Sequence, residues 1–115
     1  MHKRGDYEFL QDIGEAINRI ESYAGRMEYQ ELLKDIKTQD AVVRNLEIIG
    51  EAVKNISADL KEKHKEIDWK SIAGMRDKII HFYFGVDWDI VWKVISKNLP
   101  ELKPKIEAIV RGMEK

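Results

Sequence analysis

Apolar residues recur at intervals of three and four along almost the whole chain, which is the spacing of an α-helix that buries one face. Residues 6–26 show this pattern and predict a first helix, and Gly25 lies where it ends. Residues 38–63, which open with Thr38, predict a second helix, and a short apolar piece lies between the two. The apolar positions are Phe9, Leu10, Ile13, Ile17, Ile20, Ala24, Tyr29, Leu32, Leu33, Ile36, Val42, Val43, Leu46, Ile49, Val53, Ile56 and Leu60.

The second half of the chain carries clear signals for helix starts and stops. Asp68 is a suitable N-cap for a helix that begins at Trp69, and Asp87 can cap the helix after it. Gly85 predicts a break between these helices, and Pro100 predicts an end or a kink. The buried candidates of this half are Ile72, Ala73, Ile79, Ile80, Val91, Val94, Ile95, Leu99, Leu102, Ile106, Ile109, Val110 and Met113.

No segment alternates between apolar and polar residues as an exposed strand does. We therefore predict an all-α fold, an antiparallel up-and-down bundle of four to five helices, in a single domain over residues 1–115. Gly14 lies inside the first helix, where glycine lowers helix stability, and this suggests a close helix contact.

Composition excludes several classes of protein. The 115 residues include no cysteine, so neither disulfides nor thiolate chemistry are available. No apolar run approaches the roughly 18 residues that a membrane span needs, so we expect a cytoplasmic protein without a membrane partner. Twenty basic residues nearly balance 21 acidic ones, for a net charge of −1. Any contact with nucleic acid must therefore be local, or assembled from two chains.

Two polar features are left over once the core is assigned, and the first lies in the helix from Thr38. Arg44, Glu47 and Glu51 follow one another at spacings of three and four, so they share one helix face beside the apolar stripe. A solvated face with helical ion pairs is one interpretation. The other is a polar stripe that lines a groove or a dimer contact and supports the site described next.

The second feature is the segment from Arg76 to Tyr83, which contains an arginine, a histidine and a tyrosine within eight residues. Histidine is suited to moving protons near neutral pH, and arginine offers a fixed fork of donors for phosphate oxygens. Together Arg76 and His81 form a minimal set for cleaving a phosphodiester in RNA without a metal or other cofactor. A hydrogen-bonded helix end without catalysis is the competing interpretation.

Helix geometry bears on how this segment could work. Asp77 stands four residues before His81, so in a continuous helix it could orient the imidazole. In the same helix, His81 would lie about 140° around the axis from Arg76, whereas Tyr83 would return to the Arg76 face. Either the helix ends near His81, or a dimer interface completes the site.

Other candidates are weaker. His64 and Glu66 do not have convincing metal-ligand spacing, so no metal site is predicted. His64 lies in a lysine- and glutamate-rich stretch that is typical of solvated surface. An aromatic group is more typical of core or interface than of a base-stacking platform, and it consists of Trp69, Phe82, Tyr83, Phe84, Trp88 and Trp92.

These residues resemble a known family. Arg76, His81 and Tyr83 reproduce the R-x4-H-x-Y pattern of the HepT-like toxins of the HEPN superfamily. Residues 40–52, with the sequence EIIGEA at their end, are similar to a characteristic helix of that family. The pairs Asp68-Trp69 and Val86-Asp87, and Val91-Trp92 after them, also look like the family, so the likeness runs from about Asp6 to Leu99.

The resemblance implies a helical homodimer in which two motifs face a shared cleft. It implies a metal-independent endoribonuclease acting on an RNA substrate, with Arg76 and His81 as catalytic residues. It also implies an MntA-like nucleotidyltransferase antitoxin as partner, which silences the toxin by transferring AMP to Tyr83. Many relatives carry Asn after the motif arginine, where this chain has Asp77, whose charge would weaken attraction for RNA phosphate. The alternatives are a non-catalytic module that binds a nucleotide or the nucleotidyltransferase, and a structural helical dimer without a ligand.

Overall fold

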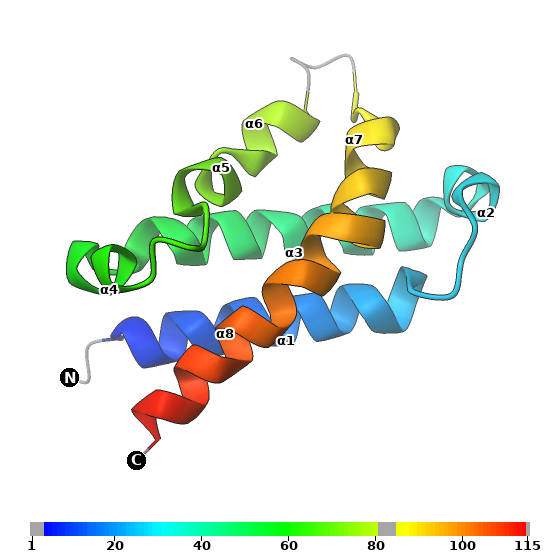
Figure 1. Cartoon of the computed structure of the whole chain (residues 1–115). Coiled ribbons are helices and arrows are strands. Elements are labelled where there is room, and N and C mark those ends of the chain that lie inside the picture. The colour runs from blue at the N-terminus through cyan, green and yellow to red at the C-terminus, as the bar shows by residue number, and fades with distance from the viewer. Residues whose placement is uncertain (1–3, 81–84, 115) are drawn as a thin grey trace.

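The computed structural model describes residues 4–80 and 85–114, and these residues are almost entirely helical (Figure 1). In this part of the chain no strand forms, although an isolated antiparallel bridge joins Ile80 to Val86. The predicted all-α class is confirmed. The elements are α1 (Asp6–Ala24), α2 (Tyr29–Lys34), α3 (Ile36–Asn55), α4 (Ala58–Lys63), α5 (Trp69–Ala73), α6 (Met75–Ile79), α7 (Trp88–Lys93), the π-helical turn η1 (Val94–Asn98) and α8 (Leu99–Met113).

The described part is organised around the antiparallel pair α1 and α3, with α8 crossing α1 (Figure 1). α5 and α6 form one arm, and α7, η1 and α8 form another. Along the chain, each arm runs in the direction opposite to that of the long element or arm before it. In the described part of the chain, α1, α3 and these two arms therefore form the up-and-down bundle that the sequence predicts. Burial of an aliphatic side chain is worth about 1.5–3 kcal/mol. The fully buried positions of α1 and α3 are Leu10, Ile13, Ile17, Ile20, Val42, Leu46, Ile49 and Val53.

The helix predicted to start near Thr38 is present, but the prediction that it continues to about Lys63 is wrong. The helix starts at Ile36, because Oδ1 of Asp35 accepts a hydrogen bond from the Thr38 amide at 3.0 Å and caps it. It ends at Asn55, and Ser57 has extended backbone and caps the separate helix α4. Asp6 accepts hydrogen bonds from the Ser57 amide at 2.8 Å and from its hydroxyl at 2.6 Å. A contact across 51 residues thus marks the break.

The helix predicted to begin at Trp69 is divided into α5 and α6. Asp68 caps it as predicted, since its Oδ1 accepts a hydrogen bond from the Ser71 amide at 3.1 Å. The chain then breaks at Gly74 and resumes at Met75. Trp69 is buried, and its indole N–H donates to the His64 carbonyl at 3.0 Å. This bond ties the start of the α5–α6 arm to the loop before it.

The last arm is continuously helical from Trp88 to Met113, so Pro100 does not end it. Asp87 caps α7 as predicted, through the Ile90 amide at 3.3 Å. Pro100 has no N–H to bond to the turn before it. The preceding residues adopt the wider π-helical turn η1, in which the Leu99 amide donates to the Val94 carbonyl. We attribute this local widening to Pro100.

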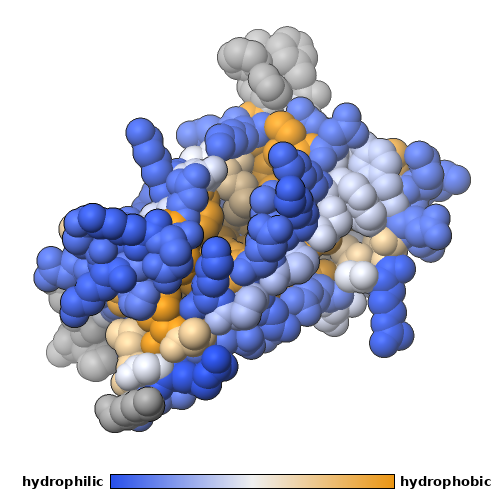
Figure 2. Space-filling model, viewed as in Figure 1, coloured by the Kyte–Doolittle hydropathy of each residue, from blue (hydrophilic) through white to orange (hydrophobic). Residues whose placement is uncertain are grey.

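Several predicted burials are wrong. Ile36 is 71% exposed, Leu33 37% and Met113 41%, because these positions lie at helix ends that no described element covers. No described atom lies within 4 Å of a Cβ built on Gly14, so the suggested close helix contact is absent from the described structure. None of the helices in the described ranges is long and apolar enough to cross a membrane. Figure 2 shows apolar surface in the furrow between the α5–α6 arm and the last arm.

Candidate active site

Arg76 lies on α6, and the neighbouring residues of this short helix anchor it. Met75 is 7% exposed and Ile79 is 1% exposed, so both side chains point into the core. Arg76 faces the other way, with its side chain 55% exposed. Its Nε donates a hydrogen bond to Oε2 of Glu47 on α3 at 2.8 Å. The motif arginine is therefore accessible to solvent and also attached to the central helix.

The electrostatic setting keeps Arg76 charged. The hydrogen bond to Glu47 and the charge of Glu47 raise the pKa of the guanidinium, and Asp77 adds to this increase. Partial desolvation opposes the effect. Because the guanidinium pKa starts well above neutrality, Arg76 is a permanent cation in any working pH range. Arg76 can therefore bind an anion but cannot serve as a proton donor or acceptor.

A shallow groove of about 370 Å³ runs beside Arg76, and we call it the α3 groove. Arg44, Glu47 and Glu51 all line it, as the groove interpretation of this helix face predicts. Arg44 and Glu51 are also exposed, so the solvated-face interpretation holds for them as well. The full lining is Phe9, Asp12, Arg44, Glu47, Ile48, Glu51, Ala52, Asn55 and Arg76.

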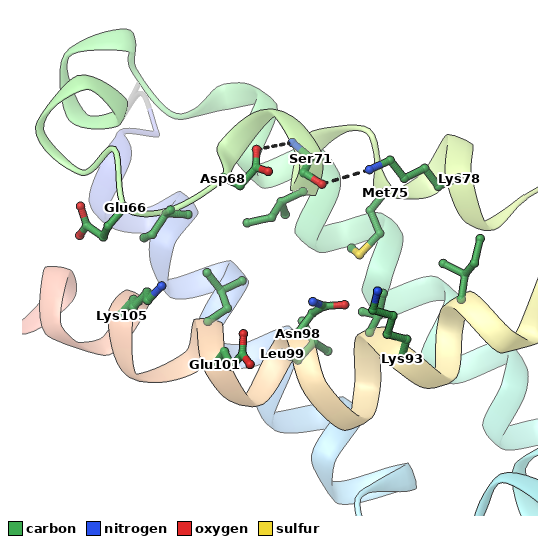
Figure 3. A pocket seen from close by; sticks show the side chains of 15 residues that line it. Glu66, Asp68, Ser71, Met75, Lys78, Lys93, Asn98, Leu99, Glu101 and Lys105 are labelled. Atoms are coloured by element: carbon green, nitrogen blue, oxygen red, sulfur yellow. Dashed lines mark hydrogen bonds between the residues drawn. The ribbon is translucent and has the colours of Figure 1, made fainter.

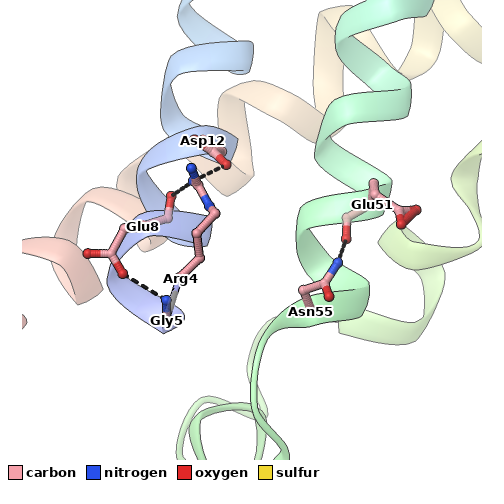
Figure 4. A network of polar contacts seen from close by, with 6 residues as sticks. All are labelled: Arg4, Gly5, Glu8, Asp12, Glu51 and Asn55. Carbon is pink, nitrogen blue, oxygen red and sulfur yellow. Dashed lines mark hydrogen bonds and ion pairs between the residues drawn. The ribbon is translucent and has the colours of Figure 1, made fainter. Parts of the chain in front are cut away.

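Figure 4 shows two sets of polar contacts on the helices that border the α3 groove, one at the start of α1 and one near the end of α3. Arg4 forms an ion pair with Asp12 and also donates to the Glu8 carbonyl at 3.3 Å. Across from them, the Asn55 side chain donates to the Glu51 carbonyl at 2.9 Å. Arg4 thus balances the negative charge of Asp12, and Arg76 balances the negative charge of Glu47.

The helix that carries Arg76 ends before His81. α6 stops at Ile79, Ile80 has extended backbone, and the Asp87 amide donates to the Ile79 carbonyl at 2.7 Å. This bond and the Ile80–Val86 bridge hold together the two sides of the segment 81–84.

His81 and Tyr83 lie outside the described residues, as do Phe82 and Phe84. Because α6 ends at Ile79, the 140° separation and the return of Tyr83 to the Arg76 face do not apply. The helical basis for Asp77 facing His81 is lost for the same reason. Asp77 is exposed on α6.

Gly85 precedes Val86, the residue that bridges to Ile80. Its φ of +122° lies in a region that residues with a side chain rarely adopt. The break predicted at this glycine is confirmed. The backbone conformation at position 85 therefore favours glycine.

A second groove, of about 440 Å³, lies on the other side of α6 between the two arms of the second half (Figure 3). Apolar side chains such as Ile67, Ile72 and Leu102 line it together with acidic residues and lysines from both arms. Lys78 Nζ donates to the Ser71 hydroxyl at 3.1 Å across one wall. Arg76 does not line this groove, so the larger hollow does not contain the motif arginine.

The structure adds two features that the sequence analysis missed. The first is the specific pairing of Glu47 with Arg76, which helix spacing could not reveal because 29 residues separate them. The second is Asn45, which is 5% exposed and whose Oδ1 has no described hydrogen-bond partner. Asn45 follows Val42 by three residues and precedes Ile49 by four. The sequence alone therefore places this polar residue on the apolar stripe of the helix.

The remaining candidates lie elsewhere. Nδ1 of His64 is 3.5 Å from a carboxylate oxygen of Glu66. Among the described residues, no group of three or more histidine and carboxylate side chains could hold a metal ion. Trp92 is half-buried, and its ring lies 5.6 Å from that of Tyr29, so this part of the aromatic group contributes to packing.

Known proteins similar to this chain point to one family. The family described as "Ribonuclease HepT-like" matches residues 13–109. A Thermococcus cleftensis protein named "Probable ribonuclease HepT" is 50% identical over 107 residues, covering 93% of this chain and 97% of that protein. "Putative RNase MJ1216" of Methanocaldococcus jannaschii is 46% identical over 114 residues, covering 99% and 94%. No solved structure gives a significant match. The chain belongs to the HepT-like ribonuclease family.

Proposed function

We propose that this protein is an endoribonuclease that cleaves RNA without a metal ion. Membership of the HepT-like ribonuclease family supports the activity. The observation that carries the proposal is the exposed, permanently charged Arg76, held beside a groove and five residues before His81. A guanidinium whose Nη groups contact no described residue within hydrogen-bond distance can clamp a phosphate, and an imidazole five positions along the sequence can transfer a proton.

In the proposed reaction the ribose 2′-hydroxyl attacks the neighbouring phosphorus. His81 takes the hydroxyl proton or delivers a proton to the leaving 5′-oxygen. Arg76 binds the non-bridging phosphate oxygens, where negative charge grows in the transition state. The 2′ O–P bond forms as the 5′ O–P bond breaks, which leaves a cyclic phosphate and a free 5′-hydroxyl.

We further propose that the protein is the toxin of a toxin–antitoxin pair and works as a homodimer in the cytoplasm. Its partner is an MntA-like nucleotidyltransferase that silences it by attaching AMP to the hydroxyl of Tyr83. The added phosphate is an anion, and Tyr83 is two positions after His81 in the sequence. It would compete with RNA phosphate for Arg76. The resemblance of Arg76, His81 and Tyr83 to the family motif supports this proposal.

The near-balanced charge favours one other candidate, a non-catalytic module that binds a nucleotide or the nucleotidyltransferase. Asp77 adds to this case, because it places a carboxylate next to Arg76 in sequence. The module would bind its partner tightly but would not cleave RNA at any protein concentration.

Cleavage of a labelled RNA in the presence of EDTA separates the two candidates. We expect the wild type to cut, and Arg76→Ala and His81→Ala to lose about 10²–10⁴-fold in rate. If both variants cut as fast as the wild type, the catalytic assignment is wrong, and if no preparation cuts, the binding module is favoured.

Intact-mass measurement tests the modification. After coexpression with an MntA-like nucleotidyltransferase, the wild type should gain mass in AMP units, whereas Tyr83→Phe should not. An unmodified wild type in the presence of an active partner would contradict the proposal.

A further inference from the structure

The contact between Glu47 and Arg76 joins two elements that are distant in sequence. Oε2 of Glu47 accepts a hydrogen bond from Nε of Arg76 at 2.8 Å. Glu47 comes from the middle of α3, next to Leu46, which is 2% exposed, and its own side chain is 33% exposed. The core therefore fixes the backbone of α3 at this point, so the hydrogen bond attaches the Arg76 side chain to a rigid element.

Glu47 contacts one edge of the guanidinium, and this determines which N–H donors of Arg76 can still bind a ligand. Nε carries one N–H, and the two Nη groups carry the other four. The contact engages Nε alone, and no other described residue contacts the guanidinium within hydrogen-bond distance. The outer edge, with both Nη groups, can therefore bind two oxygens of one phosphate in parallel. Arg76 is 55% exposed, so this edge can be reached from solvent.

We propose that Glu47 is a positioning residue, which holds the Nε edge of Arg76 so that the Nη edge faces the phosphodiester of the RNA. This inference rests on the proposed ribonuclease function. Glu47 touches no reacting atom and acts only through Arg76. A long arginine side chain loses rotamer freedom when it binds phosphate, and a prior attachment reduces that loss at the moment of binding.

The negative charge of Glu47, taken alone, would hinder the binding of RNA phosphate by Arg76. A carboxylate 2.8 Å from the guanidinium weakens its net attraction for an anion. If Glu47 acted mainly by charge, its removal would therefore speed up cleavage. A benefit from Glu47 must come from geometry, and geometry is preserved by glutamine, which keeps an oxygen acceptor without the charge.

Kinetics of two variants test the proposal. We expect Glu47→Ala to lower kcat about 10- to 100-fold, because a displaced Arg76 no longer stabilises the negative charge that develops on the phosphate in the transition state. KM should change less than kcat. Glu47→Gln should stay within about threefold of the wild type, because it retains the acceptor. A Glu47→Ala variant as fast as the wild type or faster overturns the proposal, as does a Glu47→Gln variant as slow as Glu47→Ala.

The chain offers a matched control in Glu21, whose Oε2 lies 3.1 Å from Nζ of Lys103. This pair also joins two helices, α1 and α8, and is similarly exposed, but it does not line the α3 groove. Glu21→Ala should leave cleavage within about twofold of the wild type, since surface ion pairs contribute little. A loss as large as that of Glu47→Ala would assign the effect to general helix pairing and overturn the proposal.

An NMR measurement makes the test independent of activity. The Nε–H of Arg76 should exchange slowly with water in the wild type and in Glu47→Gln, and quickly in Glu47→Ala. Equal exchange in all three would show that the bond does not form in solution and would overturn the inference.

The proposed function is tested separately by Arg76→Ala. If Arg76→Ala cleaves as fast as the wild type, the ribonuclease assignment of Arg76 fails, whatever the state of the Glu47 contact. If Arg76→Ala is slow and Glu47→Ala is fast, only the positioning role fails.

Discussion

Replacement of Gly85 by alanine should reduce both the stability and the activity of this protein. The φ of +122° is accessible to glycine but strained for alanine, and such strain costs about 1–3 kcal/mol. Apart from its chain neighbours, no described residue comes within 4 Å of where the alanine Cβ would lie, so the cost is worked out from backbone strain. Alanine also lowers the conformational entropy of the unfolded chain, which stabilises the folded state by about 0.4–1 kcal/mol and offsets part of the strain. We expect a net loss of about 0.5–2 kcal/mol, which for this chain length lowers Tm by roughly 2–8 °C.

Gly14→Ala is the matched control, because it makes the same chemical change inside α1. No described atom lies within 4 Å of its Cβ either. Alanine is better than glycine in a helix interior by about 0.5–1 kcal/mol, so Tm should rise by roughly 2–5 °C.

Thermal unfolding followed by circular dichroism at matched protein concentration compares the two variants. RNA cleavage measured well below Tm should fall for Gly85→Ala and be unchanged for Gly14→Ala. A Gly85→Ala protein at least as stable as the wild type would refute the reasoning from φ.

Three further predictions concern stability. Asn45→Leu should raise the free energy of unfolding by about 0.5–1.5 kcal/mol, because removing a buried acceptor without a described partner outweighs the loss of the hydrogen bond from Nδ2 to the Ala41 carbonyl at 2.9 Å; a lower free energy of unfolding would mean that Oδ1 is satisfied elsewhere. Ile79→Ala should lower it by about 2–5 kcal/mol in denaturant titrations, whereas the exposed Ile36→Ala should stay within about 0.5 kcal/mol. Hydrogen bonding from Thr38 lowers the pKa of Asp35, so its stabilisation is present above the unfolded pKa and lost as pH falls through the folded one. The Tm difference between wild type and Asp35→Asn should therefore shrink below about pH 4, and a constant difference would contradict this.

Local patterns predicted much of the fold. Asp68 and Asp87 cap helices as expected, because an N-cap needs only its own side chain and an amide three residues later. The stripes of α1 and α3 are also buried as their spacing predicts. The break at Ser57 was not predictable, because Asp6, 51 residues away, supplies its hydrogen bonds.

Part of the lining of the candidate site was predictable from helical spacing, but its geometry was not. Helical spacing placed Arg44, Glu47 and Glu51 on one face, and all three line the α3 groove. Spacing could not select Glu47 as the partner of Arg76, because that choice depends on how α6 packs against α3. It also could not end α6 at Ile79, because that ending is marked by a bond from Asp87 back across the segment 81–84.

Analysis of the cleavage products tests the central claim most directly. An RNA oligonucleotide and the same oligonucleotide with 2′-deoxyribose at the cleaved position are incubated with the wild-type protein in EDTA, and the product ends are identified by mass spectrometry. The account predicts cleavage of the RNA alone, with a cyclic phosphate on one product and a 5′-hydroxyl on the other, and loss of both in His81→Ala. Cleavage of the deoxy-substituted strand at an equal rate, or 5′-phosphate products, would contradict it.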